Sequence, residues 1–423
     1  MHRAYAFIFN STNQKEEQDR MPKSKKSGCF GNAPFSRRKG RTRNFRIIVI
    51  MMAVLLTFIT IAAPAAAWGA GQNVEAADLE YNPRIENMIS QINESEIYHT
   101  TYKLQNFSSR KYPSVGNILA SQYLYGRLVN ISGLQVEYQG TGFQNIIATI
   151  PGREVASNMT FIVGAHYDSI SDTGAYAPGA TDNGCGTAIV LELARVMNQY
   201  DFNHTIKFAF WNAEEVSPKG SQDYVNYARK NSMNIPLYFN YDSSCYDPQN
   251  QYVLDIMFDN KTEKISELII RYNYLYKVNF QLTSNVHSCT SDHLSFRQGG
   301  YPAIMTHSQS HGPAHTQYDT IDKISVSYAK KNAQLGMSVL ANEAGLKGVL
   351  VLPLPGFTNP PTDPDGDGIY EDINGNNRLD FADVILFFNR MTWIGANEPV
   401  GAFDLNGNGR IDFADIVALF NEI

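Results

Sequence analysis

The sequence predicts an α/β fold, a three-layer sandwich with a mostly parallel central sheet flanked by helices, followed by a small all-α domain. Two observations support this prediction. Between about residues 79 and 345, short apolar runs alternate with longer amphipathic stretches, as in chains whose strands are joined by helices. Beyond Val349 the chain becomes proline-rich and then repeats one short motif. A chain of 423 residues also exceeds the roughly 250–300 residues that one core usually serves.

Five apolar runs are expected to form buried strands: QNIIATI, MTFIVGA, TIKFAF, PLYFNY and YPAIMTH. Apolar residues spaced three and four apart predict helices in IENMISQI, VGNILASQYLYGRLV, TAIVLELARVMNQY and KISELIIRYNYLY. In a mostly parallel sheet, sites form beyond the carboxyl ends of the strands. Side chains that directly follow these runs are therefore the first candidates for function.

The N-terminal region has the features of an export signal. Positive charge is concentrated in KSKK and SRRKGRTRNFR, an apolar stretch begins at Ile47, and small residues occupy 65–70. Met21 is an alternative start to Met1 that would leave a leader of more ordinary length. The apolar stretch is nearly long enough to span a bilayer, so an uncleaved membrane anchor is the alternative to a cleaved signal peptide. In both cases the rest of the chain is expected outside the cytoplasm, extracellular or at the cell surface.

The overall charge excludes nucleic acid as the main partner. The formal net charge is −6 and the isoelectric point is about 5.9, whereas phosphate binding requires a basic face. Four cysteines are too few for a disulfide-rich scaffold. Six N-x-S/T sequons fit the glycosylated surface of an exported protein, at Asn93, Asn106, Asn130, Asn158, Asn203 and Asn260.

These features predict four parts along the chain. Residues 1–77 form a basic leader with the signal peptide or anchor, and 78–350 form the α/β domain. Residues 351–362 are a proline-rich linker, and 363–423 form the C-terminal domain.

Histidine and carboxylate side chains follow the predicted strands of the α/β domain. They are His166 and Asp168 in GAHYDS, Asp182 in GATDNGCG, Glu214 and Glu215 in NAEEVSPKGS, Asp242 in FNYDSS and His315 in HTQYDT. Taken alone, any one of these histidines is more typical of an ordinary loop residue. Any one of the acidic residues is more typical of a helix start, where negative charge is favoured. Together at one edge of a sheet, such groups would repel one another unless cations neutralised them.

The ligand types indicate which cation this would be. Imidazole and carboxylate groups without thiolates suit zinc in an open catalytic site. Two histidines and three carboxylates suit two metal ions that share one bridging carboxylate, at a separation of about 3.5–4 Å.

The ordered motifs GAHYDS, GATDNGCG, NAEEVSPKGS and SDHLSFRQGGYPA with HTQYDT resemble the co-catalytic zinc exopeptidases, over about residues 80–345. This family includes leucyl aminopeptidases, glutamate carboxypeptidase II and glutaminyl cyclase. The resemblance implies two zinc ions, one held by His166 and Asp242 and the other by Glu215 and His315, with Asp182 as the bridge. It further implies that Glu214 is the general base, that Asp168 orients His166, and that the Asp182–Asn183 peptide bond is cis.

The resemblance implies an exported aminopeptidase that removes N-terminal residues from peptides, with Glu214 taking the proton of a metal-bridged water. A carboxypeptidase, or a glutaminyl cyclase with a single zinc ion, is the enzymatic alternative. A non-catalytic surface attachment protein is the other alternative, although the intact set of ligands and base argues against it. Cys245 lies three residues after Asp242 and Cys289 three before Asp292, so these two cysteines could meet and form the disulfide bond that an exported protein allows. Cys185 is expected to be a small buried filler.

The C-terminal domain contains the repeats DINGNNRLDFADVILFF and DLNGNGRIDFADIVALF. Oxygen-bearing side chains at positions 1, 3, 5, 9 and 12 around a glycine turn are typical of calcium loops. The candidate ligands are Asp372, Asn374, Asn376, Asp380 and Asp383, and Asp404, Asn406, Asn408, Asp412 and Asp415. An acidic turn without metal is the alternative, but the motif occurs twice in register. Upstream, DPDGDGIYED offers a further calcium loop with Asp363, Asp365, Asp367 and Glu371.

The paired repeats look like a dockerin domain, with aspartate instead of the EF-hand glutamate at position 12. Because dockerins bind cohesin modules, the resemblance implies a cohesin-like or cell-surface protein partner. The alternative is that calcium only stabilises the C-terminus, since small domains often need a metal ion to fold.

Overall fold

The computed structural model describes residues 81–140, 142–284, 290–349 and 351–423. The predicted leader, with its signal peptide or anchor, lies outside these residues. None of the helices in the described ranges is both long enough and apolar enough to cross a bilayer.

Eight strands of the described chain form one mostly parallel sheet in the order β1-β2-β5-β3-β6-β9-β7-β8. Strands β5, β3, β6 and β9 are parallel neighbours, while β1 and β2 are antiparallel additions at one edge. At the other edge β7 is antiparallel to β9 and parallel to β8. The strand bounds are β1 Gln135–Gln139, β2 Asn145–Ile150, β3 Thr160–His166, β5 Thr205–Trp211, β6 Tyr238–Tyr241, β7 Val253–Met257, β8 Gln281–Ser284 and β9 Ala303–Ser308.

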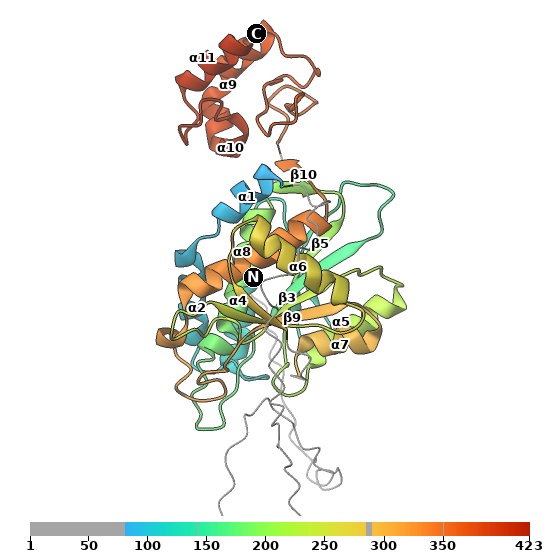
Figure 1. Cartoon of the computed structure of the whole chain (residues 1–423), viewed down its shortest axis with the longest axis vertical. Coiled ribbons are helices and arrows are strands. Elements are labelled where there is room, and N and C mark those ends of the chain that lie inside the picture. The colour runs from blue at the N-terminus through green and yellow to red at the C-terminus, as the bar shows by residue number, and fades with distance from the viewer. Residues whose placement is uncertain (1–80, 141, 285–289, 350) are drawn as a thin grey trace, which may run out of the picture. The chain divides into compact units, whose positions relative to one another are not determined.

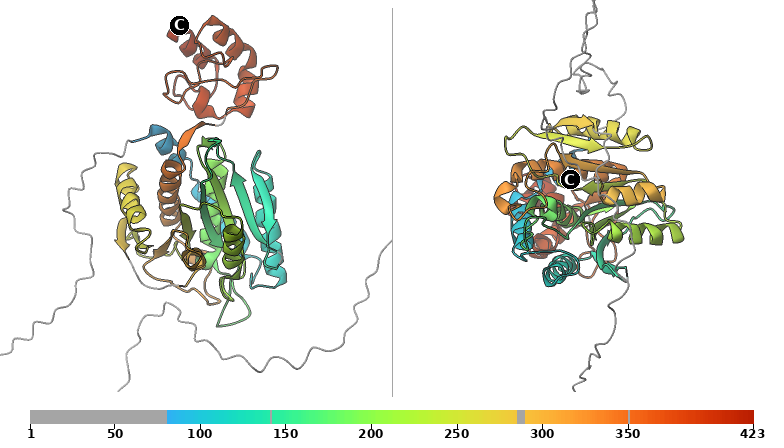
Figure 2. Two further views of the ribbon diagram at one scale, coloured as in Figure 1. Left: turned by 90° about the vertical axis from the view of Figure 1, so that its right-hand side faces the viewer. Right: turned by 90° about the horizontal axis from the view of Figure 1, so that it is seen from below.

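Helices cover both faces of this sheet (Figures 1 and 2). On one face, α5 (Lys219–Lys230) and α7 (Asp292–Gly299) pack around Trp211 and Tyr238. On the other face lie α4 (Cys185–Met197), α6 (Glu263–Leu275) and α8 (Val326–Glu343). The predicted three-layer α/β sandwich is therefore confirmed.

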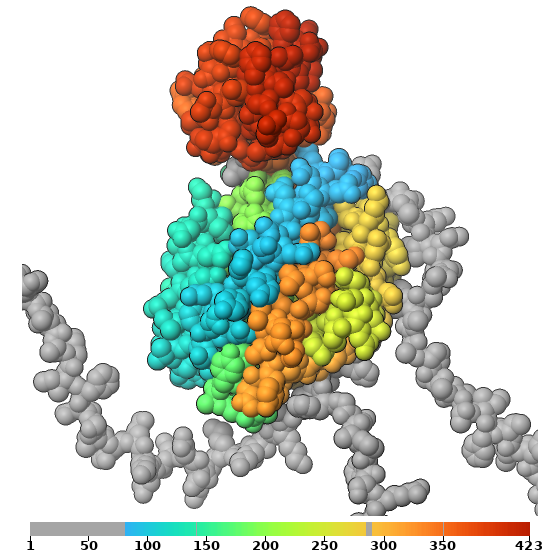
Figure 3. Space-filling view, turned by 90° about the vertical axis from the view of Figure 1, so that its left-hand side faces the viewer, coloured from blue at the N-terminus to red at the C-terminus, as the bar shows by residue number. Residues whose placement is uncertain are grey.

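Three N-terminal helices complete the larger layer: α1 (Pro83–Ser90), α2 (Glu94–Gln105) and α3 (Val115–Val129). Each begins at a residue whose side chain accepts a hydrogen bond from a backbone amide of the first turn, namely Asn82, Asn93 and Ser114. Helices α1 and α2, blue in Figure 3, lie beside the orange α8. A small antiparallel pair joins β4 (Tyr200–Phe202), from the middle of the α/β domain, to β10 (Leu346–Val349), at its end.

The C-terminal region is helical, as predicted, with α9 (Phe381–Asn397), α10 (Val400–Phe403) and α11 (Phe413–Glu422). Its own apolar core includes Phe387, Phe403 and Leu419. Val351 and Leu354, from the stretch predicted as a linker, are buried in the same core. The four domain bounds remain predictions.

Candidate metal centres

Each predicted zinc-site residue lies at the carboxyl end of the parallel strands or just beyond it. His166 is the last residue of β3, Glu214 and Glu215 follow β5, and Asp242 follows β6. Asp182 lies in a short irregular turn, η1 (Ala180–Gly184), immediately before α4, and His315 lies in the loop after β9. Because β5, β3, β6 and β9 are adjacent and parallel, these residues meet at one edge of the sheet.

The carboxylate of Asp182 lies between two pairs of side chains. Its Oδ1 is 3.2 Å from His166 Nε2, which is itself 3.7 Å from Asp242 Oδ2. Its Oδ2 is 3.1 Å from His315 Nε2, which is 3.0 Å from Glu215 Oε2. Each oxygen of Asp182 therefore faces one imidazole, and each imidazole faces one further carboxylate.

The electrostatics of this cluster favour bound positive charge. Burial opposes a charge on His166, yet Asp168, Asp182 and Asp242 raise its pKa well above the ordinary value. Hydrogen bonds to Asp182 and Glu215 raise the pKa of His315 to about 11. Burial and the charge of Asp182 raise the pKa of Glu215 to about 7. The raised pKa values mean that, without metal, protons on these side chains neutralise the clustered carboxylates. Bound divalent cations would do the same, and imidazole and carboxylate groups are ligands that suit zinc.

The turn after β5 explains why two carboxylates stand side by side. Ala213 adopts a left-handed conformation with φ 59°, uncommon for a residue other than glycine, asparagine or aspartate. Asp168 holds the next two residues, because Oδ1 accepts from the Glu214 amide and Oδ2 from the Glu215 amide, both at 3.1 Å. Asp168 Oδ1 also lies 3.5 Å from His166 Nδ1. One buried carboxylate thus positions both glutamates and the histidine ring.

Glu214 differs from Glu215 in its surroundings. Glu215 is buried and its Oε2 lies 3.0 Å from His315 Nε2, whereas Glu214 is only partly buried. Burial raises the pKa of the Glu214 carboxyl well above its ordinary value. A carboxylate with a raised pKa beside a candidate metal site is suited to accept and return a proton.

Two buried charged residues that the sequence analysis did not single out hold the loop of Asp182. Asp319 accepts hydrogen bonds from the Thr181 amide and hydroxyl through Oδ1, and from the Asp182 amide through Oδ2, at 2.7–3.0 Å. Arg110 is fully buried and donates to three backbone carbonyls, those of Tyr167, Pro178 and Gly179. Asp319 could have been found from its place in HTQYDT, but the sequence gives no signal for Arg110.

The disulfide prediction is wrong, because Cys245 pairs with Cys185. Cys185 lies three residues after Asp182 and Cys245 three residues after Asp242. The two cysteines therefore belong to neighbouring loops of the metal centre, with their Cα atoms 6.4 Å apart. For the same reason Cys185 is not a simple buried filler, and Cys289 lies outside the described residues. The Asp182–Asn183 peptide bond is cis, as predicted.

The two C-terminal repeats share one hydrogen-bond pattern. The aspartate at position 1 accepts two backbone amides from positions 5 and 6: Asn376 and Asn377 for Asp372, and Asn408 and Gly409 for Asp404. The aspartate at position 12, Asp383 or Asp415, is fully buried. It accepts a hydrogen bond of 2.6–2.7 Å from the side-chain amide of Asn374 or Asn406 at position 3. Asp380 and Asp412, at position 9, cap α9 and α11.

Comparison with known protein families agrees with both parts of this description. Residues 145–340 match the model of Peptidase family M28, and residues 370–423 match that of the Dockerin type I domain. The chain therefore contains an M28 peptidase domain and a C-terminal dockerin type I domain. It is thus a metallopeptidase, and the dockerin domain implies a cohesin partner.

The M28 domain is similar to leucine aminopeptidases. Leucine aminopeptidase 1 of Paracoccidioides brasiliensis is 27% identical over 293 residues, covering 62% of this chain and 74% of the relative. Among solved structures, an aminopeptidase of Legionella pneumophila aligns with a TM-score of 0.58 at 18% identity, covering 65% of this chain and 78% of that one. A glutaminyl cyclase of Bacteroides thetaiotaomicron aligns with a TM-score of 0.50 at 19% identity, covering 60% and 98%. The structural similarities concern the fold alone.

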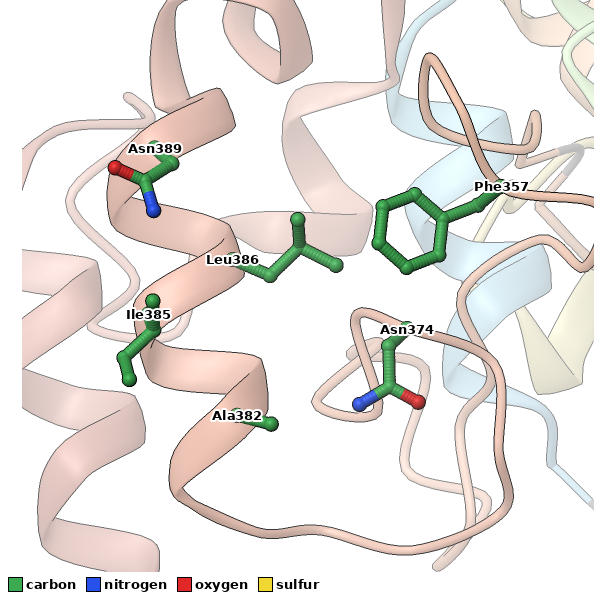
Figure 4. Close-up of a pocket in the computed structure, with 6 residues that line it drawn as sticks. All are labelled: Phe357, Asn374, Ala382, Ile385, Leu386 and Asn389. Carbon is green, nitrogen blue, oxygen red and sulfur yellow. The ribbon is translucent and has the colours of Figure 1, made fainter.

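The dockerin domain exposes a row of apolar side chains on each of its two longer helices. We call this the helix-pair face: Phe381, Ile385 and Phe388 on α9, and Phe413, Val417 and Phe420 on α11. The ring centroids of Phe381 and Phe420 are 6.1 Å apart, and those of Phe388 and Phe413 are 6.2 Å apart. Beside α9, a hollow of about 370 Å³ is lined by Phe357, Asn374, Ala382, Ile385, Leu386 and Asn389 (Figure 4). Exposed apolar surface of this kind is typical of protein contact sites.

Proposed function

We propose that the M28 domain is a dinuclear zinc aminopeptidase that removes N-terminal residues from peptides. The observation that carries the proposal is the position of Asp182 between the pair His166–Asp242 and the pair His315–Glu215. We assign one zinc ion to each pair, with Asp182 as the bridge. Similarity to leucine aminopeptidases supports the choice of substrate.

The proposed roles of the protein groups follow from their contacts. When bound, the zinc ions supply Lewis-acid activation of a water molecule and of the scissile carbonyl. Glu214 accepts the proton of that water and donates it to the leaving amine. Asp168 keeps the ring of His166 and the backbone of Glu214 in place through its contacts with both.

A substrate panel tests this function. We expect aminoacyl-p-nitroanilides with a free α-amine to be cleaved and their N-acetylated forms to resist cleavage. A chelator should abolish the activity and added zinc should restore it, with two zinc ions per chain by elemental analysis. Cleavage of blocked substrates only would contradict the aminopeptidase assignment.

A glutaminyl cyclase is the second candidate, because the fold is shared with the Bacteroides thetaiotaomicron enzyme. It predicts cyclisation of peptides with N-terminal glutamine, no hydrolysis of the aminoacyl substrates, and one zinc ion per chain. The same panel therefore separates the two functions.

We also propose that the dockerin domain attaches the enzyme to a cohesin-bearing protein outside the cell. The two repeat loops, with bound calcium, would fix the starts of α9 and α11, and the helix-pair face would contact the cohesin. The predicted export signal and sequons agree with this location, and both remain predictions.

Binding to purified cohesin modules from the same organism tests the attachment. We expect calcium-dependent binding, and we expect the pair Phe388→Asp and Phe413→Asp to weaken it at least about tenfold, which is about 1.4 kcal/mol. The matched control is Tyr274→Asp, another exposed aromatic residue, on α6. Binding that survives both the double substitution and a calcium chelator, or the absence of any cohesin that binds, would contradict the proposal.

A further inference from the structure

We infer that the dockerin region holds a third calcium ion, bound by Asp363, Asp365, Asp367 and Glu371. Three of these four residues lie before residue 370, where the match to the dockerin family begins, and the site is additional to the two repeat loops. Each of the four residues offers one carboxylate oxygen, and these oxygens lie within 4.8 Å of one another. Calcium prefers six to eight oxygen ligands, and such a cluster supplies oxygen only.

The buried member of the cluster gives the second, independent observation. Glu371 is only 6% exposed, and its Oε2 has no hydrogen-bond partner in the described part of the chain. A carboxylate oxygen that is buried without a donor is unfavourable, and it becomes more so beside other acids. Yet the backbone places this side chain against Asp363, Asp365 and Asp367 rather than in solvent. A bound cation would satisfy the oxygen and offset the repulsion.

The backbone of this segment has the form of the repeat loops. Asp363, Asp365 and Asp367 occupy positions 1, 3 and 5, and Gly368 at position 6 has φ 105°, as the sharp turn of a calcium loop requires. Asp363 accepts backbone amides from Gly366 at 2.7 Å and Gly368 at 2.9 Å. Asp404 of the second repeat also accepts two backbone amides, from positions 5 and 6 where Asp363 accepts from positions 4 and 6.

The segment is also closed at its base. Thr362 and Asp372 pair through both backbone hydrogen bonds, and the Thr362 hydroxyl donates to Asp372 Oδ2 at 2.5 Å. Asp372 is the first residue of the first repeat loop. The third ion would therefore lie in a closed loop directly joined to the first, so that calcium orders the chain from Thr362 onward rather than from the first repeat.

Calcium stoichiometry tests the inference. We would use the full chain loaded with zinc, in excess magnesium, and count bound calcium by equilibrium dialysis with radioactive calcium. We expect three ions per chain, and two for Glu371→Gln. The double variant Asp365→Asn with Asp367→Asn changes exposed residues only, so it should keep the fold and also bind two. Asp415→Asn calibrates the loss of one ion from a repeat loop.

The matched control is Glu398→Gln, since Glu398 is equally buried in the same region but accepts from the Leu352 amide and lies outside the cluster. It should bind three ions. If the unmodified chain binds only two calcium ions, the third site does not exist. The inference is also overturned if Glu371→Gln and the double variant Asp365→Asn with Asp367→Asn both still bind three calcium ions with unchanged affinities. Neither result depends on peptidase activity, so the inference and the proposed enzyme function can fail separately.

Discussion

Replacing Glu214 with glutamine is expected to lower kcat by about 10²- to 10⁴-fold, or about 3–5 kcal/mol in activation free energy. Glutamine keeps the shape of the side chain but cannot accept the proton of the attacking water. The zinc content should remain at two ions per chain, because Glu214 is not one of the proposed ligands. Hydrolysis of an aminoacyl substrate and elemental analysis of the same sample measure both quantities.

The adjacent Glu215→Gln variant is the matched control for this experiment. The same chemical change one residue later should release zinc, because Glu215 faces His315 and is a proposed ligand. The two variants therefore lose activity by different routes, and excess zinc should partly restore only the second. A Glu214 variant that retains full activity, or that loses a zinc ion, would contradict the division of roles between the two glutamates.

The central strands could be predicted from the sequence because burial on both faces makes them continuous apolar runs. All seven residues of β3 are buried. The edge strands β1 and β8 were not predicted, because QVEYQ and QLTS are half exposed and carry mostly polar residues. The short pair β4 with β10 joins segments that are distant in the sequence, and no local pattern marks such a pair.

The candidate site was predicted where motifs carry its residues and missed where contacts between distant loops define it. His166 and Glu215 stand in motifs at strand ends, and Asp182 stands in a glycine-rich motif before α4. Arg110 holds other loops by donating hydrogen bonds to their backbone carbonyls. Such contacts leave no pattern in the sequence. The pairing of Cys185 with Cys245 depends on the approach of the loops after β3 and β6, not on spacing along the chain. Cysteine spacing alone therefore suggested the wrong partner.

Replacing both Cys185 and Cys245 with serine is expected to lower the free energy of unfolding of the M28 domain by about 4 kcal/mol. The bond spans 60 residues, and releasing a loop of that length adds conformational entropy to the unfolded chain. Each cysteine also lies three residues after a proposed zinc ligand, Asp182 or Asp242. The loss of the link between these loops should therefore weaken zinc binding as well as stability.

Scanning calorimetry of the zinc-loaded chain and competition with a chromogenic chelator measure the two effects. Reduction with tris(2-carboxyethyl)phosphine, which unlike a dithiol binds zinc weakly, should bring the unmodified chain close to the double variant. It should leave the variant unchanged, which separates loss of the bond from other effects of serine. If the double variant unfolds at the same free energy and holds zinc equally tightly, the disulfide does not support the metal centre. If only stability falls, the bond acts on the unfolded chain alone, and the two ligand loops are held by the contacts of Asp319 and Arg110.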